Sequence, residues 1–172
     1  MRSRENAVMM LARVRRAMAL TLCTMAMLAA AQPAGAGLLP YETGQWHSLL
    51  ASGQGKPLLV HFWGFSCPPC IEELPAWADF VRAHPGLNAV FIEVDQVPEE
   101  MTRRALTDAR LIDADNRANV AYFDEYFRYE IDPQWFGELP ITLLIDAKGK
   151  VRKLRGTADC AAIDRWAAGK NR

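Results

Sequence analysis

The chain has 172 residues, with 20 basic and 20 acidic side chains and therefore no net charge. Residues 1–36 hold five arginines and one glutamate, so the rest of the chain has 15 basic and 19 acidic side chains (20 − 5 and 20 − 1), a net charge of −4. This acidic balance argues against nucleic acid or an anionic membrane as a partner, and the length suits one domain with its own core.

Residues 1–36 have the features of a secretory leader. A basic segment up to Arg16 is followed by the apolar stretch Ala17 to Ala31, and Ala34-Gly35-Ala36 is a small-residue cleavage site. The apolar stretch is short for a membrane-spanning helix, which favours cleavage, although an uncleaved anchor is the alternative. We therefore expect residues 37–172 to form one periplasmic domain, either free or anchored through the leader.

The next part of the chain predicts a β–α–β unit. After a short helix within residues 38–54, the apolar run Pro57 to Trp63 is typical of a buried parallel strand. A helix is predicted from about Pro68 to Ala83, with a kink at Pro75. Asn88 to Val94 is a second buried strand, which implies parallel pairing through a right-handed crossover.

The connection from Asp95 to Leu139 has 45 residues (139 − 95 + 1), which is too long for a bare loop. We predict one helix over Pro98 to Arg110 and another over Asn116 to Arg128. The aromatic side chains from Tyr122 to Phe136 are expected to pack against the sheet. The alternative is an exposed platform that contacts a partner.

The end of the chain predicts a hairpin and a helix. Ile141 to Ile145 and Val151 to Leu154 read as antiparallel strands, and the Asp146 to Gly149 segment between them is a good turn. Thr157 to Ala168 is predicted to form the last helix.

Cys67 and Cys70 have the spacing of a redox-active dithiol. The first strand would deliver Cys67 to a helix N-terminus, where the helix dipole favours a thiolate, and Cys70 is close enough to form a disulfide with it. The alternatives are a structural disulfide or half of a zinc site, but zinc would need two more ligands and there is no second C-x-x-C. Cys160 is expected to be a free thiol with an ordinary packing role, and a redox role is the alternative.

Pro68 and Pro69 bear on the direction of the chemistry. Proline has no N–H group, so the Cys70 amide is the main local donor left for a Cys67 thiolate. We therefore expect the pKa of Cys67 not to be strongly depressed. A less stabilised thiolate makes the reduced form less stable, and hence makes the dithiol a better reductant.

Three sequence features together resemble the TlpA/ResA group of bacterial extracytoplasmic thiol–disulfide oxidoreductases. They are the FWG-x-x-C-x-x-C-x-x-E-x-P run of residues 62–75, the Gly137-Glu138-Leu139-Pro140 loop followed by a strand, and the Lys148 to Val151 turn. The resemblance extends over about residues 40–168. It implies a thioredoxin-like α/β fold: a central mixed sheet flanked by helices, with a helical insertion before a cis-proline loop.

The resemblance also implies catalytic roles. Cys67 would be the nucleophile that attacks a partner's disulfide, and Cys70 would resolve the mixed disulfide. Glu73 matches the family's active-site glutamate and would relay a proton to Cys70, whereas the alternative is an ordinary exposed glutamate. His61 stands six residues before the first cysteine, where thioredoxins have a buried aspartate. It would either shuttle protons or be a core histidine with one hydrogen bond.

Substrate contacts are expected at two places. Pro140 would form a cis peptide with Leu139 and pack against the disulfide, while the Leu139 backbone pairs with an incoming peptide. Pro68 and Pro69 would also contact the substrate. Ser66 fills the position before the first cysteine that is commonly aromatic in the family, so partner preference is expected to differ.

The resulting prediction is a monomeric periplasmic enzyme, without metal or cofactor, that reduces disulfides in protein partners and is recharged by a membrane thiol donor. The resemblance implies maturation of apocytochrome c or of an oxidase copper site. The alternatives are an oxidant that introduces disulfides and a non-enzymatic Cu(I) metallochaperone that uses Cys67 and Cys70. A peroxide-reducing role fits the paired cysteines and the glutamate less well.

Overall fold

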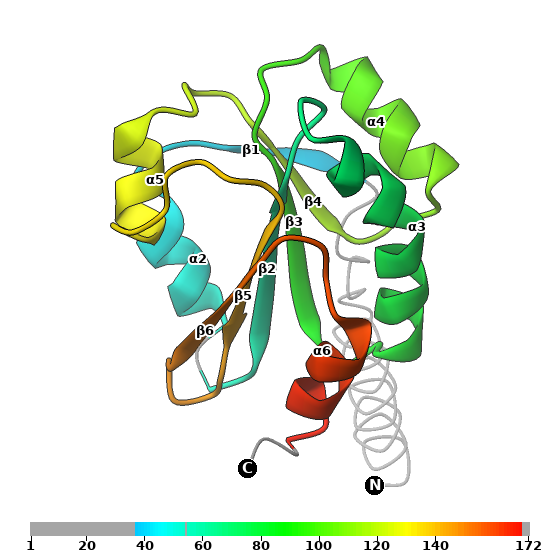
Figure 1. Ribbon diagram of the computed structural model, residues 1–172, viewed down its shortest axis with the longest axis vertical. Coiled ribbons are helices and arrows are strands. Elements are labelled where there is room, and N and C mark those ends of the chain that lie inside the picture. The colour runs from blue at the N-terminus through cyan, green and yellow to red at the C-terminus, as the bar shows by residue number, and fades with distance from the viewer. Residues whose placement is uncertain (1–36, 54, 170–172) are drawn as a thin grey trace, which may run out of the picture. The chain divides into compact units, whose positions relative to one another are not determined.

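A computed structural model of the protein describes residues 37–53 and 55–169, so the predicted leader lies outside the described residues. The described chain forms a six-stranded sheet with the strand order β1-β4-β3-β2-β5-β6 (Figure 1). The strands are β1 (Leu38–Tyr41), β2 (Leu58–Trp63), β3 (Asn88–Glu93), β4 (Asp115–Asn119), β5 (Ile141–Ile145) and β6 (Val151–Arg155). The helices are α2 (Trp46–Ser52), α3 (Pro68–Ala83), α4 (Glu99–Asp108), α5 (Glu125–Ile131) and α6 (Cys160–Ala167).

The sheet is mixed, as predicted. Strands β1, β4, β3 and β2 run parallel to one another, whereas β5 is antiparallel to both β2 and β6. All six residues of β2 are buried, which explains its continuous apolar sequence. The predicted hairpin is confirmed: the Gly149 amide donates to the Asp146 carbonyl oxygen at 2.9 Å, and Gly149 has a φ of 80° that suits glycine.

Two hydrophobic cores lie on opposite faces of this sheet. One, the α3-side core, joins Trp77 of α3 and Ile163 of α6 to Leu144 of β5. The other, the α2-side core, joins Trp46 of α2 and Phe127 of α5 to the other face of the sheet. Figure 1 shows α3 and α6 on one side of the sheet and α2 and α5 on the other. Because strand side chains alternate, β2 contributes to both cores.

The long connection differs from its prediction. The helix predicted over Asn116 to Arg128 is wrong in its first half, because residues Asp115–Asn119 form strand β4 between β3 and β1. Helix α5 begins only at Glu125, where the Asp124 side chain accepts a hydrogen bond from the Phe127 amide. The insertion before the cis-proline loop is therefore a helix–strand–helix segment.

The polar sequence of β4 gives no local sign that this segment is a strand. The Asn116 side chain is 1% exposed, and its amide group donates to the carbonyl oxygens of Leu111, Ile112 and Ala114. The Asn119 amide group donates to the Val94 carbonyl oxygen at 3.3 Å. Asn116 and Asn119 are thus buried through hydrogen bonds to neighbouring backbone, and no apolar alternation marks the strand.

The remaining elements agree with their predictions to within a few residues. Helix α3 runs from Pro68 to Ala83 and passes through Pro75. Helix α6 begins at Cys160, later than predicted, because the Asp159 side chain caps it by accepting from the Ala162 amide. Strand β1 was not predicted as a strand. Within the described part of the chain, no helix combines the length and the apolar character needed to cross a bilayer.

The aromatic side chains between Tyr122 and Phe136 divide into two groups. Phe127 and Trp135 are buried in the α2-side core, as expected from the packing interpretation. Tyr122, Tyr126 and Phe136 are strongly exposed, so that interpretation is wrong for them. The exposed rings belong to the β4–α5 connection, α5 itself and the loop before β5.

Candidate active site

Cys67 and Cys70 form a disulfide at the junction between β2 and α3. Strand β2 ends at Trp63, the Gly64–Ser66 turn follows, and Cys67 occupies the N-cap of α3. The Cys67–Cys70 bond joins residues whose Cα atoms are 5.3 Å apart. Cys67 is 8% exposed and Cys70 is 0% exposed, so the first cysteine is the one that a partner can reach.

The first turn of α3 has few donors to offer a thiolate. Pro68 and Pro69 occupy the first two helical positions and have no N–H group. The Cys70 amide donates to the Cys67 carbonyl oxygen at 3.0 Å. The donor that the sequence leaves for the Cys67 sulfur is therefore already used by the backbone.

Glu73, which lies in α3 three residues after Cys70, meets the side chain of His61 on β2. His61 Nε2 lies 3.2 Å from Glu73 Oε1, although the two atoms are not aligned for a good hydrogen bond. Glu73 Oε2 accepts a hydrogen bond from the Ala158 amide at 2.9 Å. The other ring nitrogen, His61 Nδ1, lies 2.9 Å from the hydroxyl of Thr142, its cross-strand neighbour on β5. Glu73 of α3 therefore contacts both β2 and the segment before α6, its side chain is 10% exposed, and it is not an ordinary exposed glutamate.

Burial and hydrogen bonding set the charges of this pair. His61 is completely buried, and burial lowers its pKa below the ordinary range, although the Glu73 carboxylate opposes this effect. Burial raises the pKa of Glu73, but the interaction with His61 and the Ala158 amide outweigh it and leave the Glu73 pKa below its ordinary value. At neutral pH the pair is therefore a neutral imidazole against an ionised carboxylate.

The predicted cis-proline loop lies at the start of β5. The Leu139–Pro140 peptide is cis, as predicted. The Gly156 amide donates to the Pro140 carbonyl oxygen at 2.9 Å. Leu139 packs against both cores, one of which contains the two cysteines.

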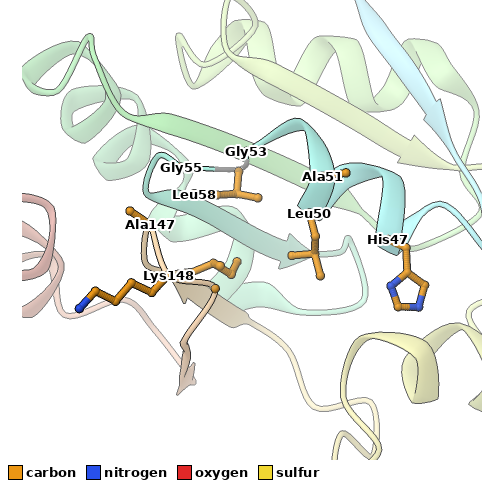
Figure 2. Close-up of a pocket in the computed structure, with 10 residues that line it drawn as sticks. His47, Leu50, Ala51, Gly53, Gly55, Leu58, Ala147 and Lys148 are labelled. Carbon is orange, nitrogen blue, oxygen red and sulfur yellow. The ribbon is translucent and has the colours of Figure 1, made fainter.

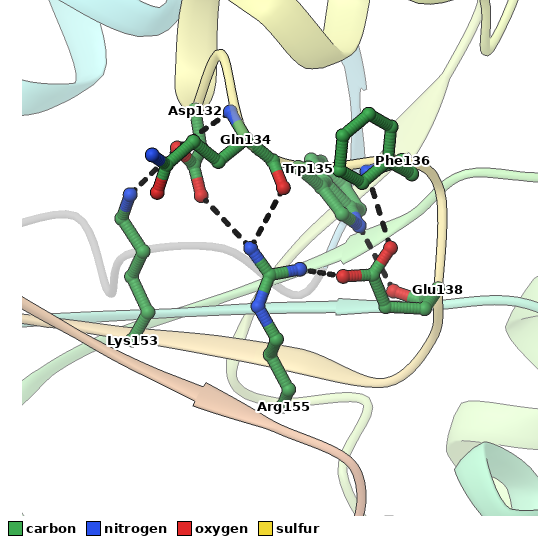
Figure 3. A network of polar contacts seen from close by, with 7 residues as sticks. All are labelled: Asp132, Gln134, Trp135, Phe136, Glu138, Lys153 and Arg155. Atoms are coloured by element: carbon green, nitrogen blue, oxygen red, sulfur yellow. Dashed lines mark hydrogen bonds and ion pairs between the residues drawn. The ribbon is translucent and has the colours of Figure 1, made fainter.

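A polar network supports this loop from strand β6 (Figure 3). The Arg155 guanidinium pairs with the Glu138 carboxylate and donates to the Gln134 carbonyl oxygen at 2.9 Å. It also lies 3.3 Å from the buried Asp132 carboxylate, which Lys153 Nζ approaches to 2.6 Å. The Trp135 indole N–H donates to the Glu138 carbonyl oxygen at 2.9 Å. Arg155 thus ties both ends of the segment before Pro140 to the sheet.

Three residues near the site were not singled out from the sequence. Thr142 faces His61 because of the register between β2 and β5. Arg155 is a charged residue of β6, and its ion-pair and hydrogen-bond partners are distant in sequence. Asp95, just after β3, accepts a hydrogen bond from the Ser66 amide at 2.6 Å. Strand register and loop contacts, which no local motif encodes, bring all three to the site.

Two further features are a cavity and a third cysteine, Cys160, whose thiol is close enough to Glu73 to feel its charge. A cavity of about 560 Å³ is lined by α2, the start of β2 and the β5–β6 turn, at the end of the sheet opposite Cys67 (Figure 2). Burial raises the pKa of the Cys160 thiol, and nearby carboxylates add to this effect, so the thiolate is disfavoured. Within the described residues, no group of three or more His, Cys, Asp or Glu side chains is placed to hold a metal ion.

Comparisons with known proteins agree with this geometry. The AhpC/TSA family matches residues 31–154. Sporulation thiol-disulfide oxidoreductase A (StoA) of Bacillus subtilis is 25% identical over 137 residues, which cover 78% of this chain and 81% of that protein. Thiol-disulfide oxidoreductase ResA of Geobacillus thermodenitrificans is 29% identical over 111 residues, or 61% of this chain and 57% of the relative.

Solved structures show the same fold. A secreted Mycobacterium tuberculosis disulfide oxidoreductase homologous to E. coli DsbE superposes with a TM-score of 0.56 at 21% identity, covering 69% of this chain and 85% of that one. A thioredoxin-family thiol:disulfide interchange protein from Chlorobium tepidum gives 0.54 at 27% identity, with 69% and 82% covered. The chain therefore belongs to the AhpC/TSA family of thioredoxin-fold proteins and is a thiol–disulfide oxidoreductase of the StoA/ResA type, with Cys67 and Cys70 as its cysteine pair.

Proposed function

We propose that the protein is an exported reductase of disulfides in protein partners. The observation that carries the direction is the hydrogen bond from the Cys70 amide to the Cys67 carbonyl oxygen. With Pro68 and Pro69 unable to donate, the helix start gives a Cys67 thiolate little hydrogen-bond stabilisation. A poorly stabilised thiolate makes the reduced form less stable and the dithiol a stronger reductant.

The reaction follows from the two cysteines. The Cys67 thiolate attacks one sulfur of the partner's disulfide, forms a mixed disulfide and releases the partner's other sulfur as a thiolate, which takes a proton from solvent. The Cys70 thiolate then attacks the Cys67 sulfur, which releases the partner's second thiolate and forms the Cys67–Cys70 disulfide. The partner gains two electrons and two protons, and the enzyme loses them.

Glu73 and His61 have the proposed role of moving the Cys70 proton. Cys70 is fully buried, so bulk water cannot readily take its proton when the mixed disulfide resolves. Glu73 is one helical turn from Cys70 and is ionised at neutral pH, so it can accept that proton. The neutral His61 ring, held by Thr142, lies against Glu73 and would assist this transfer through the carboxylate.

Substrate contact is proposed at the edge of the disulfide. The Leu139 backbone beside the cis peptide would pair with an extended segment of the partner, while Pro68 and Pro69 would form the wall next to Cys67. The exposed position of Cys67 relative to Cys70 supports this arrangement.

We place the enzyme in the periplasm as a monomer, recharged by a membrane thiol donor. The secretory features of residues 1–36 support export, followed either by release or by retention through the leader. Protein disulfides in apocytochrome c or in an oxidase copper site are the proposed substrates. The resemblance to the TlpA/ResA group supports this choice of substrates.

The reduction potential of the Cys67–Cys70 couple tests the direction. Thiol trapping of the protein in defined redox buffers gives this potential directly. We expect a value of about −270 mV or below, like that of thioredoxin. A value of about −120 mV would identify an oxidant instead and would contradict the argument from the missing amide donors.

A further inference from the structure

The turn that delivers Cys67 to the helix is held by a carboxylate that lies just after the neighbouring strand β3. Asp95 Oδ2 accepts a hydrogen bond from the Ser66 amide at 2.6 Å, and Asp95 Oδ1 accepts one from the Ser66 hydroxyl at 3.1 Å. Ser66 directly precedes Cys67, so both oxygens of the Asp95 carboxylate accept hydrogen bonds from the residue before the nucleophile.

The turn also depends on glycine at this contact. A Cβ atom on Gly64 would lie 2.8 Å from Asp95 Oδ2 and 3.0 Å from its Cγ. Such a separation is too short for a carbon–oxygen contact, and the Ser66 hydrogen bonds prevent the carboxylate from moving aside. Gly64 and Asp95 therefore form one close-packed unit.

A second acidic side chain holds Asp95 in place. Glu93 Oε1 accepts a hydrogen bond from the Asp95 amide at 2.6 Å. Glu93 is only 1% exposed and pairs with Trp63, the last residue of β2, across the β2–β3 ladder. Burial raises the pKa of Glu93 to about 8 although the Asp95 amide opposes this increase, so Glu93 is mostly uncharged at neutral pH. Glu93 thus holds the Asp95 backbone while adding little negative charge of its own to this turn.

We propose that Asp95 is a positioning residue for the nucleophile: its carboxylate fixes the Gly64–Ser66 turn through Ser66, and its charge opposes formation of the Cys67 thiolate. This inference rests on the proposed redox role of the cysteine pair. A negative charge held against Ser66, the residue before the nucleophile, works in the same direction as the missing proline amides, because both make the thiolate less stable.

The two parts of this role can be separated by substitution. Asp95→Asn keeps the size of the side chain and an oxygen that accepts from the Ser66 amide, but removes the charge. Asp95→Ala removes both the charge and the acceptor. Asp113→Asn is the matched control, because Asp113 is exposed and lies in the α4–β4 loop, away from Cys67.

The experiment measures the alkylation rate of Cys67 by iodoacetamide against pH in the reduced, full-length protein, with the labelled cysteine identified by mass spectrometry. We expect Asp95→Asn to lower the Cys67 thiol pKa and to raise its alkylation rate at pH 7 by about threefold or more. The reduction potential of the same variant should become less negative. Asp95→Ala should shift both quantities in the same direction, and Asp113→Asn should leave both unchanged.

A Cys67 pKa and a potential in Asp95→Asn that equal those of the wild type would overturn the proposal, whatever the behaviour of Asp95→Ala. A shift of equal size in Asp113→Asn would also overturn it, because the effect would then come from net charge alone. The proposed reductase function fails separately: an oxidising wild-type potential would contradict that function, while a lowered thiol pKa in Asp95→Asn would still support the role of Asp95.

Discussion

At the scale of single residues, the site combines a neutral buried histidine with an ionised glutamate. His61 is 0% exposed and lies between Thr142 and Glu73, while the indole ring of Trp77 packs against it with ring centroids 4.7 Å apart. Such an environment disfavours the imidazolium, so the Glu73 carboxylate is the stronger candidate to take a proton from Cys70. We therefore propose that Glu73 accepts the proton and that His61 acts through Glu73.

The role of Glu73 is testable with an amide. Glu73→Gln keeps the shape of the side chain but cannot accept a proton, so it should slow catalysed insulin reduction by about tenfold or more. Glu72→Gln is the matched control, because Glu72 is the adjacent exposed residue of α3. Wild-type turnover in Glu73→Gln, or an equal loss in both variants, would rule out a specific proton relay.

Glu93 makes stability depend on pH. Its pKa rises from 4.5 to about 8 in the folded state. Between these values the folded state holds a proton that the unfolded state has lost, so the free energy of unfolding should fall as pH rises through this window and level off above it. Glu93→Gln mimics the protonated acid, so it should flatten this dependence and be more stable than the wild type at pH 9 by on the order of 2 kcal/mol.

Urea unfolding at pH 5, 7 and 9 measures this effect. The exposed Glu100→Gln is the control and should follow the wild-type dependence. An unchanged slope in Glu93→Gln would mean that Glu93 is ionised in the folded protein throughout this range.

At the scale of elements, strand β6 supports the cis-proline loop. Lys153 and Arg155 are two residues apart on β6, so they share one face of the strand and both reach the buried Asp132 at the end of α5. Arg155 extends this contact to Glu138, next to Leu139 (Figure 3). The β5–β6 hairpin, to which the sequence assigns no functional role, therefore supports the cis-proline loop.

Removing Arg155 should affect binding more than redox chemistry. Arg155→Ala frees the segment from Gln134 to Glu138, so the KM for a protein disulfide substrate should rise severalfold while the reduction potential stays unchanged. Arg152→Ala removes a neighbouring exposed arginine of β6 and should leave both quantities as in the wild type. A changed potential, or an unchanged KM, in Arg155→Ala would contradict a role in loop support.

At the scale of the whole molecule, one sheet joins the two hydrophobic cores. Leu143 and Leu144 are adjacent on β5 and both are 0% exposed, yet they enter opposite cores. The disulfide belongs to the α3-side core, whereas the support of the cis-proline loop reaches the α2-side core through Trp135. Because both cores share β2 and β5, we expect them to unfold together.

A matched pair of cavity substitutions tests this coupling. Leu143→Ala and Leu144→Ala should each lower the free energy of unfolding by about 2–5 kcal/mol. Each variant should still show one transition, with coincident midpoints by near-ultraviolet and far-ultraviolet circular dichroism. Separate midpoints in either variant would mean that the two cores unfold independently.

Local patterns predicted much of the molecule. The apolar run of β2, the C-x-x-C at a helix start and the turn before β6 are short-range signals, and each is confirmed in the structure. These three features depend on periodicity, backbone freedom and spacing, which the chain carries locally. The cis peptide before Pro140 is also present, but it was expected from the resemblance of the Gly-Glu-Leu-Pro loop to the TlpA/ResA group.

Strand β4 shows where local patterns fail. Its sequence, Asp-Asn-Arg-Ala-Asn, has no apolar alternation and was predicted to begin a helix. It is a strand because β1 and β3 supply backbone partners on both sides, and because Asn116 and Asn119 find buried carbonyl acceptors. Those partners are set by tertiary structure, which overrides weak local preference.

The sequence by itself determined the chemistry of this protein: two cysteines on one helical turn, two prolines that remove amide donors, and a glutamate one turn later. Only the tertiary structure decided what surrounds them. It brought Thr142 and His61 to Glu73, Asp95 to the turn before Cys67, and Arg155 to the cis-proline loop. The physical reason is that covalent neighbours set which groups can react, whereas strand register and packing set the charges and hydrogen bonds that control how readily they do so.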